Sequence, residues 1–233
     1  MSITASTSGD TLLNAARVFV EKNRGRTVFL EHEVKGLLKD IGLPVPAGIF
    51  VKKGQDISSI HKLPYPVVAK VSSEKITSKS DVHGVRIGIE NDGELKSAAE
   101  ELGRIEYAEG VLIEAMAPPG MEVIVGGIVD TQFGPVVMFG LGGISVELFK
   151  DVTFGLAPLT QEAALRLIKQ VKGYRLLEGY RGRPPLDLNA LLHIIVSISE
   201  LMASDLIEEI DLNPIALYPE GAMILDAKLS LRP

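Results

Sequence analysis

The stretch MEVIVGGIVDTQFGPVVMFGLGG, residues 121–143, decides the fold class of this protein. Two apolar runs, residues 121–130 and 134–142, flank the tetrapeptide TQFG, and this pattern predicts a β-hairpin with both strands largely buried. Stretches with helical and strand patterns alternate around it. We therefore expect an α+β, or mixed α/β, protein with an antiparallel hairpin in its second half.

The rest of the chain supplies the elements that surround this hairpin. Asp92 and Thr160 are the expected N-caps of two helices, because short polar side chains accept hydrogen bonds from the free N–H groups of a helix start. The second of these helices is expected to stop at a glycine. Residues 207–231 are expected to form two strands joined by the turn YPEGA. Helices are predicted over residues 10–24, 29–42, 92–105, 160–173 and 185–205, and further strands over 47–51, 64–72, 85–90 and 110–117.

Composition narrows the class of protein. Of the 233 residues, 46% are apolar and 23% charged, as in ordinary globular proteins. A net charge of −6 argues against nucleic-acid binding, since phosphate backbones bind basic surfaces. The absence of cysteine excludes disulfides, thiolate metal sites and cysteine nucleophiles. We expect no signal peptide and no membrane contact, and so a cytoplasmic location.

A glycine cluster follows the second hairpin strand. In FGLGGISVE, residues 139–147, Gly140, Gly142 and Gly143 allow the backbone to turn tightly and bring N–H groups close to an anion. A plain turn between two elements explains the same residues. The sequence therefore suggests a phosphate-binding loop without excluding the simpler interpretation.

Oxygen-bearing side chains gather near the end of the chain. Asp211 and Asn213 lie two residues apart on a strand-like segment and so face the same side, and Asp226 lies on the next strand. Such oxygen ligands suit Mg²⁺, which usually takes few protein ligands together with phosphates and water. The alternative is turn chemistry at a strand end, with Asn-Pro starting a bend.

Lysines mark the stretch VVAKVSSEKITSKSDVHGV, residues 67–85. Lys70 ends an apolar strand, which is a costly place for a charge unless an anion such as a phosphate meets it or the side chain snorkels to the surface. Lys79, Asp81 and His83 follow in a polar loop, where a lone histidine is more often structural than catalytic. Glu31 and Glu33 are explained by the dipole of the helix that they begin.

Together these features resemble the ATP-grasp domains, and more narrowly the β subunits of the ADP-forming acetyl-CoA (acyl-CoA) synthetases, which are relatives of succinyl-CoA synthetase. The resemblance covers residues 23–233, and its most specific part is FGPVVMFGLGGISVE followed by DLNP. It implies two lobes with a nucleotide in the cleft between them. We expect a polar tail and helix over residues 1–22, an N-terminal lobe over 23–115 and a C-terminal lobe over 116–233.

The resemblance also implies roles for individual residues. Lys70 would contact the α- and β-phosphates of ATP or ADP. Asn213 and Asp226 would hold Mg²⁺, with Asp211 nearby, and Arg181 would steady a loop or face a partner subunit. The remaining implied nucleotide contacts are the hinge residues Glu114, Ala115 and Met116 against adenine, Glu122 near the ribose and phosphates, and the glycines Gly140, Gly142 and Gly143 facing the transferred phosphoryl group.

The implied reaction interconverts acyl-CoA, ADP and phosphate with free acid, CoA and ATP. CoA handling belongs to the family's α subunit, and nothing in this chain resembles that subunit's CoA-binding domain. The expected assembly is a heterotetramer of two α and two β chains. In the family, a histidine of the α subunit carries phosphate to the β subunit. The loop after the Lys70 strand is the part that normally receives this phosphate, and its residues Lys79, Asp81 and His83 are candidate catalytic residues.

Two departures from the family pattern qualify this expectation. Ser78 stands where the family has a histidine proposed as a second phosphate carrier, and Gly155 stands where it has an arginine. His83 occupies the position of a glycine, and its replacing the lost histidine would require a loop shift. A catalytically silent nucleotide-binding partner is therefore one alternative function, and a stand-alone ATP-dependent carboxylate ligase is another.

Overall fold

The fold is described from a computed structural model, in which residues 6–57, 63–143 and 151–232 are described. The chain forms two compact units. The smaller unit consists of residues 30–34 and 46–118, and the larger of residues 1–29, 35–45 and 119–233. Within the described residues, no helix is both long and apolar enough to cross a bilayer.

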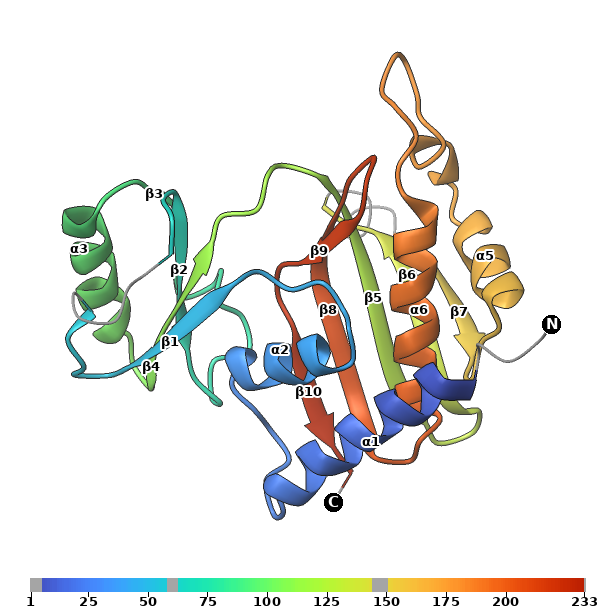
Figure 1. Ribbon diagram of the computed structural model, residues 1–233, viewed down its shortest axis with the longest axis horizontal. Helices are drawn as coiled ribbons and strands as arrows, with labels where there is room; N and C mark the ends of the chain where they lie inside the picture. Colours follow the sequence, from blue (N-terminus) through green and yellow to red (C-terminus); the bar gives the residue numbers. More distant parts are fainter. Residues whose placement is uncertain (1–5, 58–62, 144–150, 233) are drawn as a thin grey trace. The chain divides into compact units, whose positions relative to one another are not determined.

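The smaller unit is a four-stranded sheet with one helix packed against it. The strand order over the described residues is β1-β4-β2-β3, and every pairing is antiparallel. Helix α3 packs against β2, β3 and β4, as Figure 1 shows, and covers one face. The elements are β1 Gly48–Lys52, β2 Val67–Ser72, β3 Val85–Ile89, α3 Asp92–Gly103 and β4 Gly110–Ala115.

The alternation of side chains along β2 separates an apolar face from a charged one. Val67, Ala69 and Val71 belong to the hydrophobic cluster that also includes buried residues of α3. Lys70, between them in sequence, points to the opposite face of the sheet. Because Lys70 pairs with Leu112 and Val68 pairs with Glu114, the side chains of Lys70 and Glu114 share that opposite face.

The larger unit is built on the predicted hairpin. Strands β5, Met121–Asp130, and β6, Gly134–Leu141, pair in antiparallel register from Val123 with Leu141 to Asp130 with Gly134, which confirms the hairpin. The path of the six-stranded sheet is β10-β8-β5-β6-β7, with β9 pairing to β8. The other strands are β7 Val152–Leu156, β8 Ile207–Leu217, β9 Ala222–Ile224 and β10 Lys228–Leu231.

Helices cover one face of this larger sheet, as Figure 1 shows. The long helix α6, Leu188–Met202, packs on β5, β6 and β8, and α5, Gln161–Lys169, packs on β7 and α6. Helix α1, Ser6–Lys22, contacts α6. A Cβ added to Gly127 would lie 2.5 Å from Met202 Cγ, so α6 and β5 approach each other closely there. Helix α2, Glu31–Asp40, begins in the smaller unit and ends in the larger one.

The structure confirms the mixed α/β class and the predicted helices, and corrects several details. Thr160 caps α5 through Ala163 N–H, as predicted. The N-cap of α3 is Asn91 rather than Asp92, because the Asn91 side chain accepts from Glu94 N–H while Asp92 is already helical. Helix α5 ends at Lys169 with the cap residue Gln170 in a right-handed conformation, so no glycine stops it.

The end of the chain also differs from the prediction. Residues 207–231 form three strands rather than two, because β9 and β10 each pair with β8 and are separated by residues 225–227. Leu225 N–H donates to Pro214 C=O inside this break. Strand β7 was not predicted; it is short, and Gly155 interrupts its apolar pattern.

Candidate functional site

Lys70 is buried and ion-paired on the charged face of the smaller sheet. Its Nζ lies 2.9 Å from Glu31 Oε1 and 2.6 Å from Glu114 Oε2. Only 8% of Lys70 is exposed, and the two glutamates are buried as well. The snorkelling alternative is therefore wrong, and the anions that meet this lysine are carboxylates of the chain itself.

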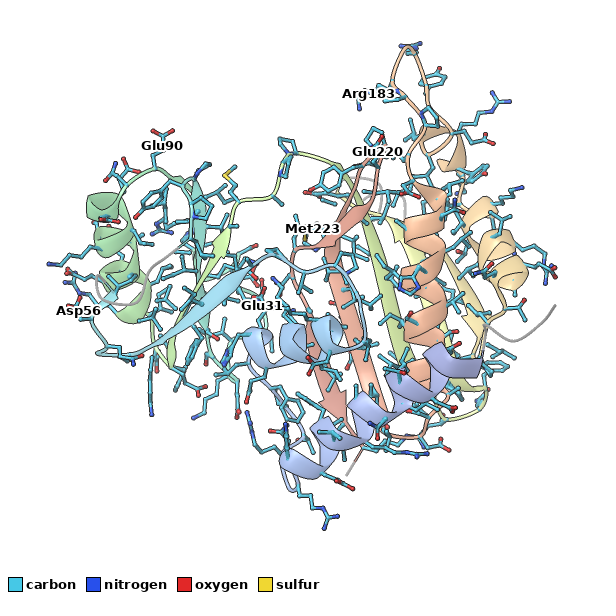
Figure 2. The ribbon with its side chains drawn as sticks, in the orientation of Figure 1. Glu31, Asp56, Glu90, Arg183, Glu220 and Met223 are labelled. Atoms are coloured by element: carbon cyan, nitrogen blue, oxygen red, sulfur yellow. The ribbon has the colours of Figure 1, made fainter. Side chains whose placement is uncertain are left out.

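A second lysine joins the same group. Lys79 Nζ lies 3.0 Å from Glu31 Oε2, so the two carboxylate oxygens of Glu31 bind two different ammonium groups. Figure 2 shows Glu31 in the first turn of α2, where His32 stacks on Phe50 of β1 with ring centroids 4.1 Å apart. Sequence reasoning missed Glu31, because the helix dipole was a sufficient explanation for an acid at that position.

Residues 73–84 form the loop between β2 and β3 that carries the other candidate catalytic residues. Gly84 N–H donates to Lys79 C=O and Gly84 C=O accepts from Val71 N–H, and a Cβ on Gly84 would lie 2.4 Å from a Val71 methyl carbon. His83 has φ = 50°, a left-handed conformation that favours glycine. Asp81 and His83 are exposed, so the loop brings Lys79 into the buried group and leaves these two at the surface.

The predicted hinge lies at the end of β4. Glu114 is the second carboxylate partner of Lys70, a side-chain role beyond the predicted adenine contact. The N–H of Ala115 donates to Ala47 C=O, and the N–H of Met116 donates to Pro66 C=O. An adenine contact through either N–H would therefore require exchange of a protein hydrogen bond.

The glycine cluster and Glu122 come together in the larger unit. Gly142 N–H donates to Glu122 C=O at 2.8 Å, and a Cβ on Gly142 would lie 2.9 Å from the Glu122 carbonyl carbon. Gly143 has φ = 63°, and its Cβ position lies 3.8 Å from Glu122 Oε2. A Cβ on Gly140 would meet Val152 Cγ1 at 2.8 Å. Close approach requires a glycine at Gly140 and Gly142, and the left-handed φ favours one at Gly143. Residues 144–147 of the predicted loop lie outside the described part of the chain.

The predicted metal ligands lie on β8 and next to it. Asp211 pairs with Lys228 of β10, and Asp226 lies in the break between β9 and β10. Burial raises the pKa of the Asp211 carboxyl; the Lys228 ammonium opposes this rise, and the Asp226 and Glu209 carboxylates add to it. The two aspartates are therefore close enough to repel each other.

The geometry around Asn213 departs from a regular strand. Val123 of β5 pairs with Ile215 and Val125 pairs with Leu212, so Asn213 and Pro214 together oppose a single residue of β5. Asn213 is exposed, and Asp211 and Asp226 are half-buried. Two carboxylates that repel each other, together with a nearby amide oxygen, form a donor set that fits Mg²⁺. Among the described residues, no group of three or more His, Cys, Asp or Glu side chains converges on one point.

Another aspartate in the larger unit organises backbone. Asp187 caps α6 through Ala190 N–H and also accepts from Gly221 N–H, and these two hydrogen bonds lower the pKa of its carboxyl. It therefore ties the start of α6 to the turn between β8 and β9.

Arg181 lies in the loop before α6 and is exposed. It has φ = 50°, and its guanidinium carbon lies 5.4 Å from the centroid of the Tyr180 ring. It lines a pocket of about 860 Å³ together with Met121, Arg183 and Tyr218. Figure 2 shows Arg183 in this loop and Glu220 in the turn between β8 and β9.

Both positions that depart from the family pattern are described. Ser78 lies in the loop between β2 and β3, and its Oγ accepts a long 3.4 Å contact from Asp81 N–H. Gly155 pairs with Val137 in the sheet, and a Cβ there would lie 3.1 Å from Leu159 Cδ2 and 3.5 Å from Leu167 Cδ1 of α5. A side chain at this position would therefore start toward the face of the sheet that α5 covers.

Comparisons with known proteins match almost the whole chain. The ATP-grasp domain family matches residues 21–231. The β subunit of the ADP-forming acetate–CoA ligase I of Pyrococcus furiosus is 43% identical over 227 residues, which cover 93% of this chain and 97% of that protein. The ADP-forming acetate–CoA ligase II of Archaeoglobus fulgidus is 41% identical over 87% of this chain, and this match spans only 30% of that longer protein.

A solved structure shows the same fold. It is that of the dinucleotide-forming acetyl-coenzyme A synthetase 1 of Ca. Korarchaeum cryptofilum, in complex with coenzyme A and Mg-AMPPCP, with its phosphohistidine segment pointing towards the nucleotide-binding site. The TM-score is 0.78 at 39% sequence identity, and the match covers 97% of this chain and all of that one.

Proposed function

This chain belongs to the ATP-grasp domain family and, within it, to the β subunits of the ADP-forming acetate–CoA ligases, and on that premise we propose that it transfers a phosphoryl group between a partner subunit and ADP. The overall reaction is acyl-CoA + ADP + phosphate = carboxylic acid + CoA + ATP. A CoA-binding α subunit supplies the acyl chemistry, and we expect two α and two β chains in the complex.

The observation that carries the proposal is the correspondence with the Pyrococcus β subunit, which extends over 97% of that protein. A match of this extent leaves little of that protein without a counterpart in this chain. The Korarchaeum structure adds a nucleotide analogue, magnesium and a phosphohistidine segment in one related enzyme. This chain contains no cysteine, and its ion-paired lysines suit phosphate chemistry.

In the proposed step, the phosphorus–nitrogen bond of a partner phosphohistidine breaks and its electron pair stays on the imidazole nitrogen. A terminal phosphate oxygen of ADP forms the new phosphorus–oxygen bond, so ATP and free histidine result. Catalysis of such a transfer consists mainly of alignment and neutralisation of crowded negative charge. Lys70 and Lys79 supply the positive charge, and the N–H group of Gly143 supplies an oriented dipole.

Asp211, Asn213 and Asp226 would hold Mg²⁺. The fit rests on the chemistry of these oxygen donors and on the pKa of the Asp211 carboxyl, which burial raises first and the Asp226 carboxylate raises further, because a bound cation favours the charged form of a buried carboxyl. When bound, Mg²⁺ supplies charge neutralisation at the phosphate oxygens. The protein residues keep their own roles: the lysines bind phosphate, and the glycines allow the backbone to approach it.

Reconstitution tests the proposal. The chain is purified together with its cognate α subunit and supplied with acetyl-CoA, ADP, phosphate and Mg²⁺. We expect ATP formation that requires both subunits. ATP formation by the α subunit alone at the full rate would contradict the proposal.

A silent regulatory partner is the second candidate, and Ser78 favours it. A phosphoserine ester has too little transfer potential to charge ADP, so Ser78 cannot replace a phosphate-carrying histidine. In addition, this chain has Gly155 where the family has an arginine, so it lacks that cation. This candidate predicts that the complex binds Mg·ADP, measured by calorimetry, without forming ATP in the same reconstitution.

A further inference from the structure

Glu31 stands between two lysines that come from different elements. We propose that Glu31 is a positioning residue, which holds the loop of residues 73–84 against Lys70 and so sets the two ammonium groups for the phosphoryl step. The claim that Glu31 sets the lysines for phosphoryl transfer rests on the proposed function. The claim that Glu31 holds the loop concerns this chain alone.

The geometry of the carboxylate is the first argument. Oε1 binds Lys70 at 2.9 Å and Oε2 binds Lys79 at 3.0 Å, and only 3% of the Glu31 side chain is exposed. Two ammonium groups in a poorly solvated region repel each other strongly. A carboxylate that binds one of them through each oxygen keeps both in place, and an uncharged side chain cannot do so.

The contrast with Glu33 is the second argument. Both residues lie in the first turn of α2, where the helix dipole favours an acid. Glu33 Oε2 accepts a hydrogen bond from Leu30 N–H at 2.9 Å and so helps to cap the helix. Glu31 instead directs its carboxylate to the lysines. The needs of the helix therefore explain Glu33 and leave the placement of Glu31 to another role.

The loop itself is the third argument. Glu31 contacts the loop of residues 73–84 through Lys79, which lies between Ser78 and the exposed pair Asp81 and His83. Lys79 C=O also accepts from Gly84 N–H, which closes the loop at its end near β3. Fixing Lys79 therefore fixes the backbone that carries the other candidate catalytic groups. His32, stacked on Phe50, in turn holds the helix turn from which Glu31 projects.

The experiment compares Glu31→Gln with the matched control Glu33→Gln, which removes the same charge from the same helix turn. Hydrogen–deuterium exchange is followed in a peptide covering residues 73–84 and in a reference peptide from the β5–β6 hairpin. Steady-state kinetics of ATP formation are measured for the complex with the α subunit. Glu31→Asp, which keeps the charge on a side chain one methylene shorter, is the third variant.

We expect Glu31→Gln to raise exchange in the loop and leave the hairpin unchanged. We also expect kcat to fall by about 10- to 100-fold, since small misplacements of catalytic groups cost this much, while KM for ADP changes less than about threefold. Glu31→Asp should recover part of kcat, because a shorter side chain reaches one lysine but not both. Glu33→Gln should lower the melting temperature without changing loop exchange or kcat.

Unchanged loop exchange in folded Glu31→Gln would overturn the proposal, and so would equal effects of the two glutamine variants. If Glu31→Gln does not fold, Lys79→Met breaks the same link from the loop side and leaves the Lys70–Glu31 pair intact. It must then raise loop exchange as well. Failure of the wild-type complex to form ATP would overturn the proposed function, whereas the exchange measurement would still decide whether Glu31 anchors the loop.

Discussion

The two charged sites of this protein, one in each compact unit, are arranged in opposite ways. In the smaller unit, the cations Lys70 and Lys79 are paired with Glu31 and Glu114 at distances of 2.6–3.0 Å. In the larger unit, the carboxylates of Asp211 and Asp226 repel each other, and the pKa of the Asp211 carboxyl is raised.

The difference shows how each site is prepared for a ligand. Cations that are already held by internal carboxylates are fixed in position, so that an arriving phosphate meets an ordered site. The buried Asp211 carboxyl, whose pKa is raised, gains stability in its charged form when a cation arrives. The first site is thus expected to be sensitive to geometry and the second to the presence of metal.

Removing Lys70 gives the largest expected effect. Lys70→Met should reduce ATP formation by the complex by about 100- to 1000-fold, because a preorganised charge at the nucleotide phosphates is lost. It should also destabilise the chain by about 3 kcal/mol, since Glu114 and Glu31 lose a buried cation. Kinetics and thermal unfolding check both parts.

Lys75→Met is the matched control for this change. Lys75 is exposed, lies in the loop that follows the Lys70 strand, and has its ammonium 4.9 Å from the centroid of the Tyr107 ring. The Lys75→Met variant should form ATP at a rate near that of the wild type. Equal losses for the two variants would show that general surface charge matters, rather than the buried group.

Removing one carboxylate of the second site should act through the metal. Asp226→Asn should weaken ADP binding at least about tenfold in the presence of Mg²⁺ and have little effect in its absence, since losses of this size are typical at metal sites. Calorimetric titration of ADP with and without Mg²⁺ measures this difference. Glu220→Gln, at an exposed position in the turn between β8 and β9, is the control. If Asp226→Asn weakened ADP binding equally with and without Mg²⁺, Asp226 would not be a metal ligand.

The smallest expected effect concerns two aspartates of the larger unit, whose contributions to stability should change with pH in opposite directions. The raised pKa of Asp211 means that its charged form is disfavoured in the folded chain, so its contribution to stability falls as pH rises above about 4. Asp211→Asn should therefore raise the melting temperature at neutral pH, and this gain should vanish at low pH.

Asp187 should behave in the opposite way. Its pKa is lowered by the N–H groups of Ala190 and Gly221, so its contribution is present above about pH 4 and is lost as pH falls through the lowered value. Asp187→Asn should cost about 1 kcal/mol at neutral pH, because the amide cannot keep both hydrogen bonds. Thermal unfolding of both variants between pH 3 and 7 checks the pair. If both substitutions changed the melting temperature at neutral pH in the same direction, the attribution of the Asp211 shift to burial and of the Asp187 shift to backbone hydrogen bonds would be wrong.

Local pattern was enough to predict most of the fold. The β5–β6 hairpin follows from two apolar runs around a turn, and α5 begins directly after Thr160 because the Thr160 side chain satisfies a helix N–H. Local pattern failed where pairing partners decide the structure. Strand β7 forms by pairing with the edge of β6. In the break between β9 and β10, Leu225 N–H donates a hydrogen bond to Pro214 C=O of the neighbouring strand. Neither partner can be identified from local sequence.

The candidate site shows the same limit. A lysine inside an apolar strand signals that an anion is required, so Lys70 was identified from sequence. The anion was not, because Glu31 lies 39 residues away in the chain and looks like an ordinary helix-start acid. The sequence held a weaker signal. A charged residue on a buried strand needs a partner of opposite charge, so the acids of the chain, including those that a helix start explains, are candidate partners of Lys70.

The most direct test of the account is a single-turnover transfer. The complex with its α subunit is labelled on the partner's histidine with radioactive phosphate, freed of nucleotide, and mixed with Mg·ADP. The account predicts rapid formation of labelled ATP in the wild-type complex and loss of the label from the histidine that is about 100- to 1000-fold slower with Lys70→Met. Labelled ATP at equal rates from both complexes would contradict it.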